Sequence, residues 1–378
     1  MAHSYTPGLK VSERSRITKR RILPIQGDVL VSEGDMVTHD TVVARTALPG
    51  DVYPVNVANM LGISAAEVTR CMLKQVGETI EQGEAIALAK SFFGIFKSTA
   101  KAPITGTIES ISSVTGQVIV RGAPLPVEVM AYIPGTVTEI FSGEGVALET
   151  TGAFVQGIFG VGGEVNGPVR MAVEHHEDIL TDSHISEDMK DCIVVGGSMV
   201  TAEAIRRARE CGVKAIVSGG IEDGDLRDFL GYDIGVAITG HEKLGITLMV
   251  TEGFGSIAMS PRTFELLKSR NGQAACVNGA TQIRAGVIRP EIIIPATDTQ
   301  QKDLPPSPKE GAPTRIGDNI RCIREPWFGR IGTVASLPHE LQQMESGTWV
   351  RVLQVAFDDG SLAIVPRANV ERIEDNNL

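Results

Sequence analysis

Two patterns are missing from this sequence, and each absence excludes a class of protein. Its five cysteines form no Cys-x-x-Cys pair, so the spacing predicts neither a zinc ribbon nor a disulfide framework. No run approaches about 20 consecutive apolar residues, so no apolar membrane span is expected. Aromatic residues make up 4% of the chain, whereas glycine occurs 41 times. This balance is typical of short strands that are joined by glycine-bearing turns.

Length and charge narrow the choice further. A chain of 378 residues is expected to hold about two to four domains. The formal net charge of −11 argues against a protein that binds nucleic acid with its whole surface. The odd number of cysteines and the absence of a recognisable signal peptide indicate a reducing compartment, so a cytoplasmic protein without membrane contact is expected. No motif predicts a cofactor.

Residues 1–23 are predicted to form a basic N-terminal arm. Such an arm either binds nucleic acid or another partner, or packs on an acidic part of the chain. Against the single acid Glu13, its basic residues are Lys10, Arg14, Arg16, Lys19, Arg20 and Arg21.

Residues 24–173 repeat one theme of short alternating strands around glycine turns. Alternation with a period of two places Val, Ile and Leu on one face of a strand, and glycine supplies the positive φ that tight turns need. Between the first two blocks, a short helix is predicted over 64–75, with a capping box formed by Ser64 and Glu67. The repeated blocks span 27–37, 76–87, 102–120 and 133–140.

The order of these blocks resembles the biotinyl/lipoyl-like barrel-sandwich hybrid. Residues 74–122 match one complete unit, and the flanking blocks predict a second unit that is partial or interleaved. In carrier proteins of that family, the hairpin between the two halves of a unit bears a modified lysine. Here that hairpin, residues 88–101, lacks both the Met-Lys-Met and the Asp-Lys-Ala sequences of those carriers. We expect an apolar hairpin that packs on another domain or subunit, with a modified Lys90 or Lys97 as the alternative.

A stretch rich in histidine and acids follows at residues 174–188. Histidine and carboxylate side chains are common metal ligands, but their spacing here matches no established zinc pattern. We therefore predict an acidic linker between domains and assign no metal ligand.

The hydrophobic period changes at Asp191, and residues 190–295 are predicted to form an α/β Rossmann-like domain. A strand over 192–195, a helix over 200–210 and a strand over 214–217 make a β-α-β unit with a parallel pair of strands. Further strands are expected over 234–238 and 245–250, followed by a helix from Pro261.

Polar or glycine-rich residues follow three of these strands. In open α/β sheets, ligands bind outside the carboxyl ends of the strands, and the amides at a helix start can hold an anion. A small anionic ligand is therefore predicted there, although small residues would also permit tight strand-to-helix turns. No catalytic residue is predicted, because no Ser-His-Asp order, nucleophile elbow or paired-acid spacing is present. The candidate ligand-binding residues are Gly196, Gly197, Ser198, Gly219, Gly220, Thr251 and Glu252.

Residues 296–313 are rich in proline and polar residues and are predicted to form a linker to a C-terminal module, residues 314–378. In this module, an alternating strand runs into a Glu-Pro-Trp-Phe-Gly turn, and a second strand follows. The stretch from Gly317 to Val334 resembles the KOW motif of NusG-type transcription factors and KOW-type ribosomal proteins. That resemblance implies a small SH3-like barrel that contacts RNA, the ribosome or the transcription machinery.

Arginine and aromatic residues surround the turn of this motif. Such residues can stack on bases and hold phosphates, but the module has seven Arg against nine acids, so a protein partner is expected as readily as RNA. The candidate partner-binding residues are Arg321, Arg324, Trp327, Phe328 and Arg330.

Two functions therefore stay open. The first is a non-catalytic adaptor or scaffold whose KOW module binds a protein or RNA partner. The second is an enzyme, or an accessory subunit of one, that binds a small anionic ligand in the central α/β domain. Either could assemble as a homo-oligomer. The predicted fold class is a mostly β barrel-sandwich hybrid, a central α/β Rossmann-like domain and an SH3-like barrel.

Overall fold

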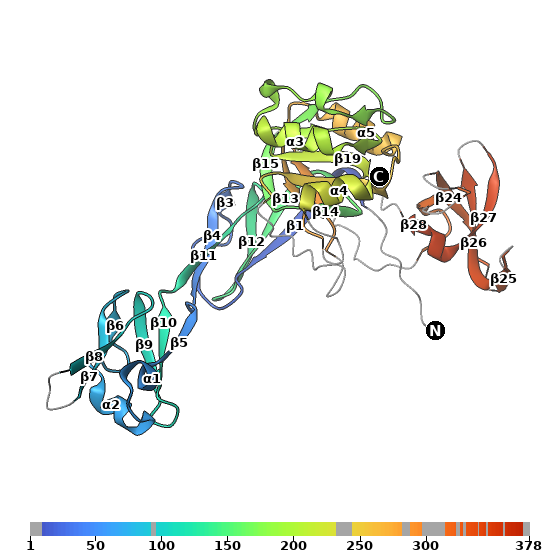
Figure 1. Cartoon of the computed structure of the whole chain (residues 1–378). Coiled ribbons are helices and arrows are strands. Elements are labelled where there is room, and N and C mark those ends of the chain that lie inside the picture. The colour runs from blue at the N-terminus through green and yellow to red at the C-terminus, as the bar shows by residue number, and fades with distance from the viewer. Residues whose placement is uncertain are drawn as a thin grey trace.

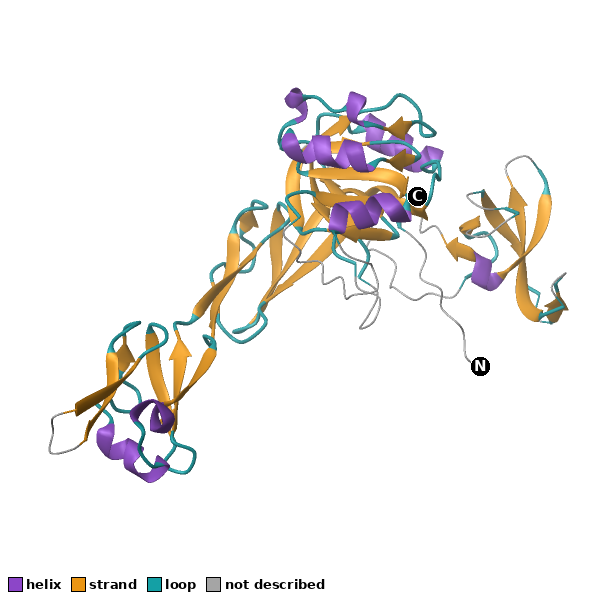
Figure 2. Ribbon diagram, viewed as in Figure 1, coloured by secondary structure: helices purple, strands orange, loops and turns teal. Residues whose placement is uncertain are grey.

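The molecule is elongated, and a lobe at one end is joined to the main body by a narrow arm of β-sheet (Figure 1). Strands make up 48% of the chain and helices 15%, and Figure 2 shows strands in every part of it. The predicted fold class is therefore wrong, because so little helix does not support a central α/β Rossmann-like domain. The computed structural model describes residues 10–91, 96–231, 244–281, 288–296, 314–322, 326–327, 330–338, 340–344, 347–357 and 360–372.

A 13-stranded sheet runs through the main body. Its strand order is β14-β20-β19-β17-β15-β21-β22-β13-β12-β3, and β1, β16 and β18 pair beside this path. On one side of β15 the neighbouring strands β17, β19 and β20 pair parallel. On its other side, the strands β21, β22, β13, β12 and β3 pair antiparallel, each with the next. The strands are β1 (Val11–Ile22), β3 (Met36–Val37), β12 (Gly135–Phe141), β13 (Gly145–Gln156), β14 (Phe159–Val161), β15 (Glu164–Met171), β16 (Ile179–Leu180), β17 (Ile193–Val195), β18 (Met199–Val200), β19 (Ala215–Ile221), β20 (Thr247–Phe254), β21 (Ala274–Asn278) and β22 (Glu291–Pro295).

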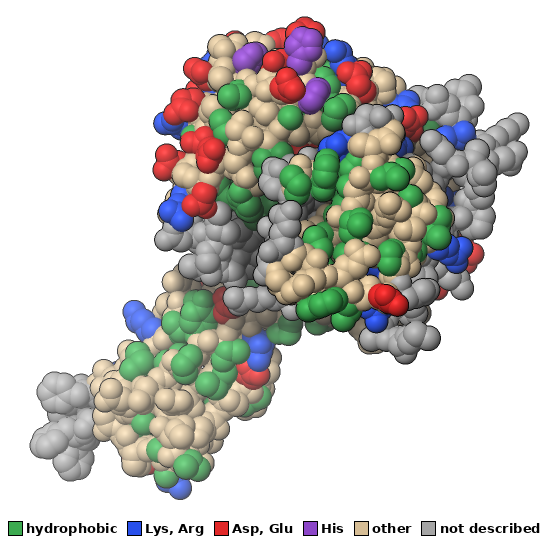
Figure 3. All heavy atoms as spheres, turned by 90° about the vertical axis from the view of Figure 1, so that its right-hand side faces the viewer, with side chains coloured by type: hydrophobic (Ala, Val, Ile, Leu, Met, Phe, Trp, Pro, Cys, Tyr) green, Lys and Arg blue, Asp and Glu red, His purple; other side chains and the backbone are tan. Residues whose placement is uncertain are grey.

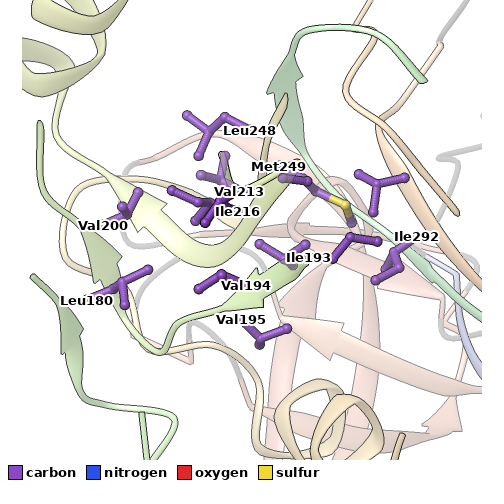
Figure 4. Close-up of a cluster of buried hydrophobic side chains, with 14 of the residues drawn as sticks. Leu180, Ile193, Val194, Val195, Val200, Val213, Ile216, Leu248, Met249 and Ile292 are labelled. Atoms are coloured by element: carbon purple, nitrogen blue, oxygen red, sulfur yellow. The ribbon is translucent and has the colours of Figure 1, made fainter. Parts of the chain in front are cut away.

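The β-α-β unit that the sequence predicts is present inside this mixed sheet. Helix α3 (Ala202–Glu210) lies between the parallel strands β17 and β19, and the Thr201 side chain caps it by accepting a hydrogen bond from the Ala204 amide. Side chains from β17, β18, β19 and β20 fill the core around it (Figure 4). The sheet continues because β15 pairs antiparallel with β21, a strand far along the chain. This long-range pairing makes the parallel strands one section of a larger sheet.

Short helices complete the main body. Helices α4 and α5 follow β19 and β20, and α5 begins at Pro261 as predicted. None of the described helices is long and apolar enough to cross a membrane. The helices of the body are η2 (Asp182–His184), η3 (Glu187–Met189), α3, α4 (Asp223–Leu230) and α5 (Pro261–Ser269).

The described part of the basic N-terminal arm forms a strand. β1 pairs with β13 over most of its length. Lys19 Nζ lies 2.5 Å from Glu291 Oε1, and Arg21 donates two hydrogen bonds, of 2.6 and 2.7 Å, to the Glu164 carboxylate. These basic residues therefore pack on acidic groups of the body, which is one of the two alternatives that the sequence left open.

Two lobes lie beyond the main body. The distal lobe has a core of its own, whereas the core of the proximal lobe continues into the body through Ile17, Cys276 and Ile293. The proximal lobe comprises residues 27–48 and 125–149, and it contains the three-stranded sheet β11-β4-β2. The distal lobe, residues 52–122, is inserted between the two parts of the proximal lobe and contains the sheet β5-β10-β9-β6 and the hairpin β7-β8. The elements are β2 (Asp28–Val29), β4 (Val42–Leu48), β5 (Val52–Asn56), α1 (Val57–Leu61), η1 (Ala65–Glu67), α2 (Val68–Cys71), β6 (Thr79–Ile80), β7 (Ala85–Ser91), β8 (Phe96–Lys101), β9 (Gly106–Ile111), β10 (Gln117–Gly122) and β11 (Leu125–Met130).

The helix predicted in the distal lobe is shorter than expected, but its start is confirmed. The Ser64 amide and hydroxyl both donate to the Glu67 carboxylate, at 3.1 and 2.7 Å, which forms the predicted capping box. The helical residues from there to Cys71 divide into η1 and α2.

One turn recurs in both lobes. In the distal lobe, the Gln75 amide donates to the Glu78 carboxylate at 2.8 Å, and Gly77 between them has a φ of +91°. In the proximal lobe, the Ser32 amide donates to the Asp35 carboxylate at 2.8 Å around Gly34, whose φ is +90°. Only glycine adopts such φ values without strain.

The turns also bond their neighbouring strands in one pattern. Gly77 N–H donates to the Ile108 carbonyl, and Ile108 N–H donates back to the Glu78 carbonyl. Gly34, Val137 and Asp35 repeat this exchange in the proximal lobe. The two lobes are therefore copies of one unit, and the second copy is nested inside the first. This arrangement fits the interleaved unit that the sequence repeats predict.

The C-terminal module has a six-stranded sheet with the order β25-β26-β24-β23-β28, and β27 pairs with β26. The recurring turn is present again, since the Arg315 amide donates to the Asp318 carboxylate at 2.8 Å around Gly317. The elements are β23 (Asn319–Cys322), β24 (Ile331–Ser336), β25 (Leu341–Gln343), β26 (Trp349–Phe357), β27 (Leu362–Pro366), η5 (Arg367–Asn369) and β28 (Val370–Arg372).

Candidate functional site

The structure brings together the seven residues that the sequence nominates for ligand binding. Parallel pairing places Gly196 beside Val217, since the Gly196 amide donates to the Val217 carbonyl at 2.8 Å. Gly220 lies opposite Gly253 on the next strand. All seven residues are buried. The prediction that these strand ends meet is thus supported by their positions, and what they can bind depends on what covers them.

Two segments of the chain cover the strand ends closely. A Cβ atom on Gly197 would lie 2.4 Å from the Asp178 carbonyl oxygen, and one on Gly219 would lie 2.2 Å from the Ile257 carbonyl oxygen. The Ser198 amide donates to the Asp178 carbonyl at 2.8 Å, and the Gly219 amide donates to the Gly197 carbonyl at 2.7 Å. These glycines are therefore needed for close backbone packing, and these amides are engaged within the chain.

The polar side chains of the set also bond within the protein. Ser198 Oγ donates to the Glu177 carbonyl at 2.8 Å, and Thr251 Oγ1 donates to the Ser218 carbonyl at 3.3 Å. The Glu252 carboxylate, 5% exposed, accepts a 3.0 Å hydrogen bond from the Ser260 amide at the start of α5. A carboxylate at this end of a helix stabilises it through the helix dipole. Glu252 thus has a structural task that its sequence position did not reveal.

The histidine- and acid-rich stretch lies at the surface of the main body. Figure 3 shows His and acidic side chains together at the top of the molecule. Within the described ranges, no three His, Cys, Asp or Glu side chains come close enough to hold a metal ion. Asp178 instead closes a turn, because its carboxylate accepts the His175 amide at 2.8 Å.

A buried polar cluster that sequence reasoning missed lies where β1 joins the body. Tyr132 has a φ of +72°, which is strained for a residue with a side chain, and its ring is 4% exposed. Burial, with the nearby Glu291 carboxylate, raises the pKa of Tyr132 well above its usual value. Arg21 lies over the ring at 5.5 Å, and the Tyr132 hydroxyl has no hydrogen-bond partner in the described structure. The unusual φ at a tyrosine has no sequence signal that could have predicted it.

In the C-terminal module, the turn residues that are described pack within the module. The guanidinium of Arg330 lies 3.9 Å from the ring centroid of Phe357 and 5.4 Å from that of Trp327. The Trp327 and Phe357 rings are 5.4 Å apart, and Trp327 packs against the buried core. Arginine stacked on aromatic faces stabilises such a turn. Arg324 and Phe328 lie outside the described residues, as does the side chain of Arg321.

The exposed apolar residues of the module lie on another strand. Leu362 and Ile364 on β27 are 60% and 51% exposed. They face the same side of the sheet as their cross-strand neighbours Ala356 and Gln354. We call these four residues the β27 face. Arg330 borders it, since its guanidinium donates to Ser361 Oγ at 3.4 Å.

The β27 face is also a sheet edge. Among the described strands, β27 pairs with β26 alone, so its second edge has no partner strand there. A hydrophobic strand at a sheet edge offers both side chains and backbone groups to another chain. The alternation of residues 362–365 could have predicted this face, had its edge position been known.

No protein-family model matches the chain, and no curated protein matches its sequence.

Proposed function

We propose that this chain is a non-catalytic adaptor whose C-terminal module binds a protein partner through the β27 face. The observation that carries the proposal is the exposure of Leu362 and Ile364, 60% and 51%, side by side on an edge strand. Exposed apolar side chains of this size mark contact surfaces when they are adjacent. An extended segment of a partner can add to such an edge, with main-chain hydrogen bonds for affinity and apolar pockets for specificity.

The surroundings of this face favour a protein over RNA. RNA binding needs cationic side chains that reach phosphates, and aromatic rings that are free to stack on bases. Here the guanidinium of Arg330 is stacked on Phe357, and Trp327 is packed against the core. Leu362 and Ile364 instead present uncharged, aliphatic surface.

A pull-down from the source organism tests this proposal with the full chain. The variant carries Leu362→Ser and Ile364→Ser, and the matched control carries Leu341→Ser, a residue 51% exposed on β25. We expect the double variant to lose at least 90% of a partner that the wild type and the control both retain. An unchanged thermal melting curve for the double variant would show that the barrel stays folded.

Two outcomes would overturn the proposal. One is a folded double variant that retains its partners. The other is an RNA that binds the wild type and the double variant equally, with an affinity that falls steeply with salt because phosphate contacts release counterions.

A further inference from the structure

The histidine- and acid-rich stretch covers the ends of the parallel strands. We call residues 174–185 the strap. Its first part is bonded to Ser198, whose amide donates to the Asp178 carbonyl and whose hydroxyl donates to the Glu177 carbonyl, both at 2.8 Å. Further along, Leu180 on β16 is fully buried and pairs with β18. The strap is therefore fixed at its middle, and its two ends depend on local hydrogen bonds.

The last turn of the strap, η2, begins at a histidine-bonded cap. The Thr181 amide donates to His184 Nδ1 at 3.2 Å, and the Thr181 hydroxyl lies 3.0 Å from the same nitrogen. In an ordinary capping box, a Glu or Gln side chain accepts the bond from this amide, as Glu67 does from the Ser64 amide at 3.1 Å. Here an imidazole takes the place of the carboxylate, and the position is one that titrates near neutral pH.

The bond from the amide fixes the protonation state of the ring. A nitrogen that accepts a hydrogen bond carries no proton, so His184 is neutral in this arrangement and holds its proton on Nε2. When the ring gains a second proton, Nδ1 becomes a donor that faces the Thr181 N–H, and this bond is lost. The Thr181 hydroxyl can turn to accept from the charged ring and to donate to Ser183 Oγ, 2.8 Å away, but the amide has no second arrangement.

The charged groups around η2 do not compensate for that loss. Asp182 on η2 itself is exposed, and α3 packs against this turn. On α3, Glu203 pairs with Arg206 at 2.6 Å, and Arg207 pairs with Glu210 at 3.8 Å. Among the described residues, none of these side chains forms an ion pair with His184, so a proton on the ring gains no partner that offsets the lost amide bond. The other charged residues of α3, the strap and the residues that follow it are Arg209, Glu174, Glu177, Asp178, Glu187, Asp188 and Lys190.

We infer that His184 is a pH-sensitive cap of the strap, which holds η2 while the ring is neutral and releases it when the ring is protonated. Histidine titrates between about pH 5 and 8, so the cap is present above this range and is lost below it. The ring is half-buried, and Figure 3 shows histidine and acidic side chains at this surface of the main body, where protons reach them. The inference is independent of the β27 face, which lies in the C-terminal module.

Hydrogen exchange of the full chain, resolved by peptide and expressed as protection factors at pH 8 and pH 5, tests this inference. His184→Gln keeps a side-chain acceptor that does not titrate, and His184→Ala removes the acceptor. His175→Gln is the matched control, because His175 is exposed on the same strap and its backbone amide, which the substitution keeps, bonds the Asp178 carboxylate at 2.8 Å.

In the wild type and His175→Gln, protection of residues 181–185 should fall about fivefold from pH 8 to pH 5, the effect of a lost cap. In His184→Gln the protection should stay constant, and in His184→Ala it should be low at both pH values. An equal fall in the wild type and His184→Gln would overturn the inference, and so would constant protection in the wild type.

A second measurement needs no variant to fold in full. In wild type labelled with ¹⁵N-histidine, the nitrogen shifts of His184 at pH 8 should show a proton on Nε2 and none on Nδ1, because Nδ1 accepts from the Thr181 amide. A proton on Nδ1 at pH 8 would contradict the cap directly, whatever the variants show.

Discussion

The distal and proximal lobes have the same turns and the same hairpin bulge, but different elements cover the two hairpins. Among the described elements, α1 and α2 contact the distal hairpin, whereas β1 and β13 contact the proximal one. Glycine φ values and paired hydrogen bonds define the shared backbone. The difference arises from the segment before each turn, which forms α1 and α2 in the distal lobe and the end of β1 in the proximal lobe. The pair therefore shows that a repeated backbone can be kept while the element that covers one of its surfaces changes from helix to strand.

The largest effect is expected from filling the space at two equivalent glycines. A Cβ atom on Gly106 would lie 2.1 Å from the Arg121 carbonyl oxygen, and one on Gly135 would lie 2.3 Å from that of Glu149. Because backbone cannot move aside easily, Gly106→Ala and Gly135→Ala should each lower the free energy of unfolding of their own lobe by about 3 kcal/mol.

Hydrogen exchange resolved by peptide would measure this loss separately in each lobe. Gly163→Ala is the control, because nothing lies within 4 Å of its Cβ position. If only one of the two glycines proved sensitive, the lobes would not be equivalent at this strand crossing.

A smaller effect separates a buried leucine of the distal lobe from an exposed leucine of the proximal lobe. Leu61 on α1 is 6% exposed, so Leu61→Ala should destabilise the distal lobe by about 2.5 kcal/mol through lost burial and a residual cavity. Leu125 is 53% exposed, so Leu125→Ala should cost the isolated protein about 0.5 kcal/mol or less. Urea unfolding of both variants measures the two losses. Equal losses would mean that Leu125 is as buried as Leu61 in the folded protein.

Sequence patterns predicted local features of the fold but not their long-range connections. The alternation around Gly34 and Gly77 predicted the repeated turns, and Ser64 with Glu67 predicted a capping box that the structure confirms. Local hydrogen bonds decide such features, so nearby residues suffice to predict them. The pairing of β15 with β21 depends on residues far apart in the chain, and it overturned the predicted α/β Rossmann-like domain.

The candidate residues show the same difference between local features, which the sequence predicted, and long-range contacts, which it did not. The three strand ends were predicted to meet, and they do, but the sequence could not reveal that the Asp178 and Ile257 backbones close over Gly197 and Gly219. At the C-terminal turn, the pattern pointed to Trp327 as an exposed contact residue. The structure packs it beside Phe357, because a strand end distant in sequence supplies the second ring.

The last prediction leaves the sequence unchanged and compares one thiol in each of two cores. Burial raises the pKa of the Cys276 thiol from 9.0 to about 11, and this cysteine on β21 belongs to the core that the main body shares with the proximal lobe, whereas Cys71 in the distal lobe is only half-buried. Thiolate is the reactive form of cysteine. Because the pKa is higher by about two, the thiolate fraction of Cys276 near pH 8 is lower by about 100-fold, and burial adds steric protection. Iodoacetamide should therefore label Cys71 long before Cys276 in the folded protein, and both at similar rates in urea.

Because the pKa of Cys276 is higher in the folded protein, the contribution of this thiol to stability is complete below about pH 9 and is lost as the pH rises towards 11. Native labelling of Cys276 as fast as that of Cys71 at pH 8 would show that the core shared by the main body and the proximal lobe opens readily.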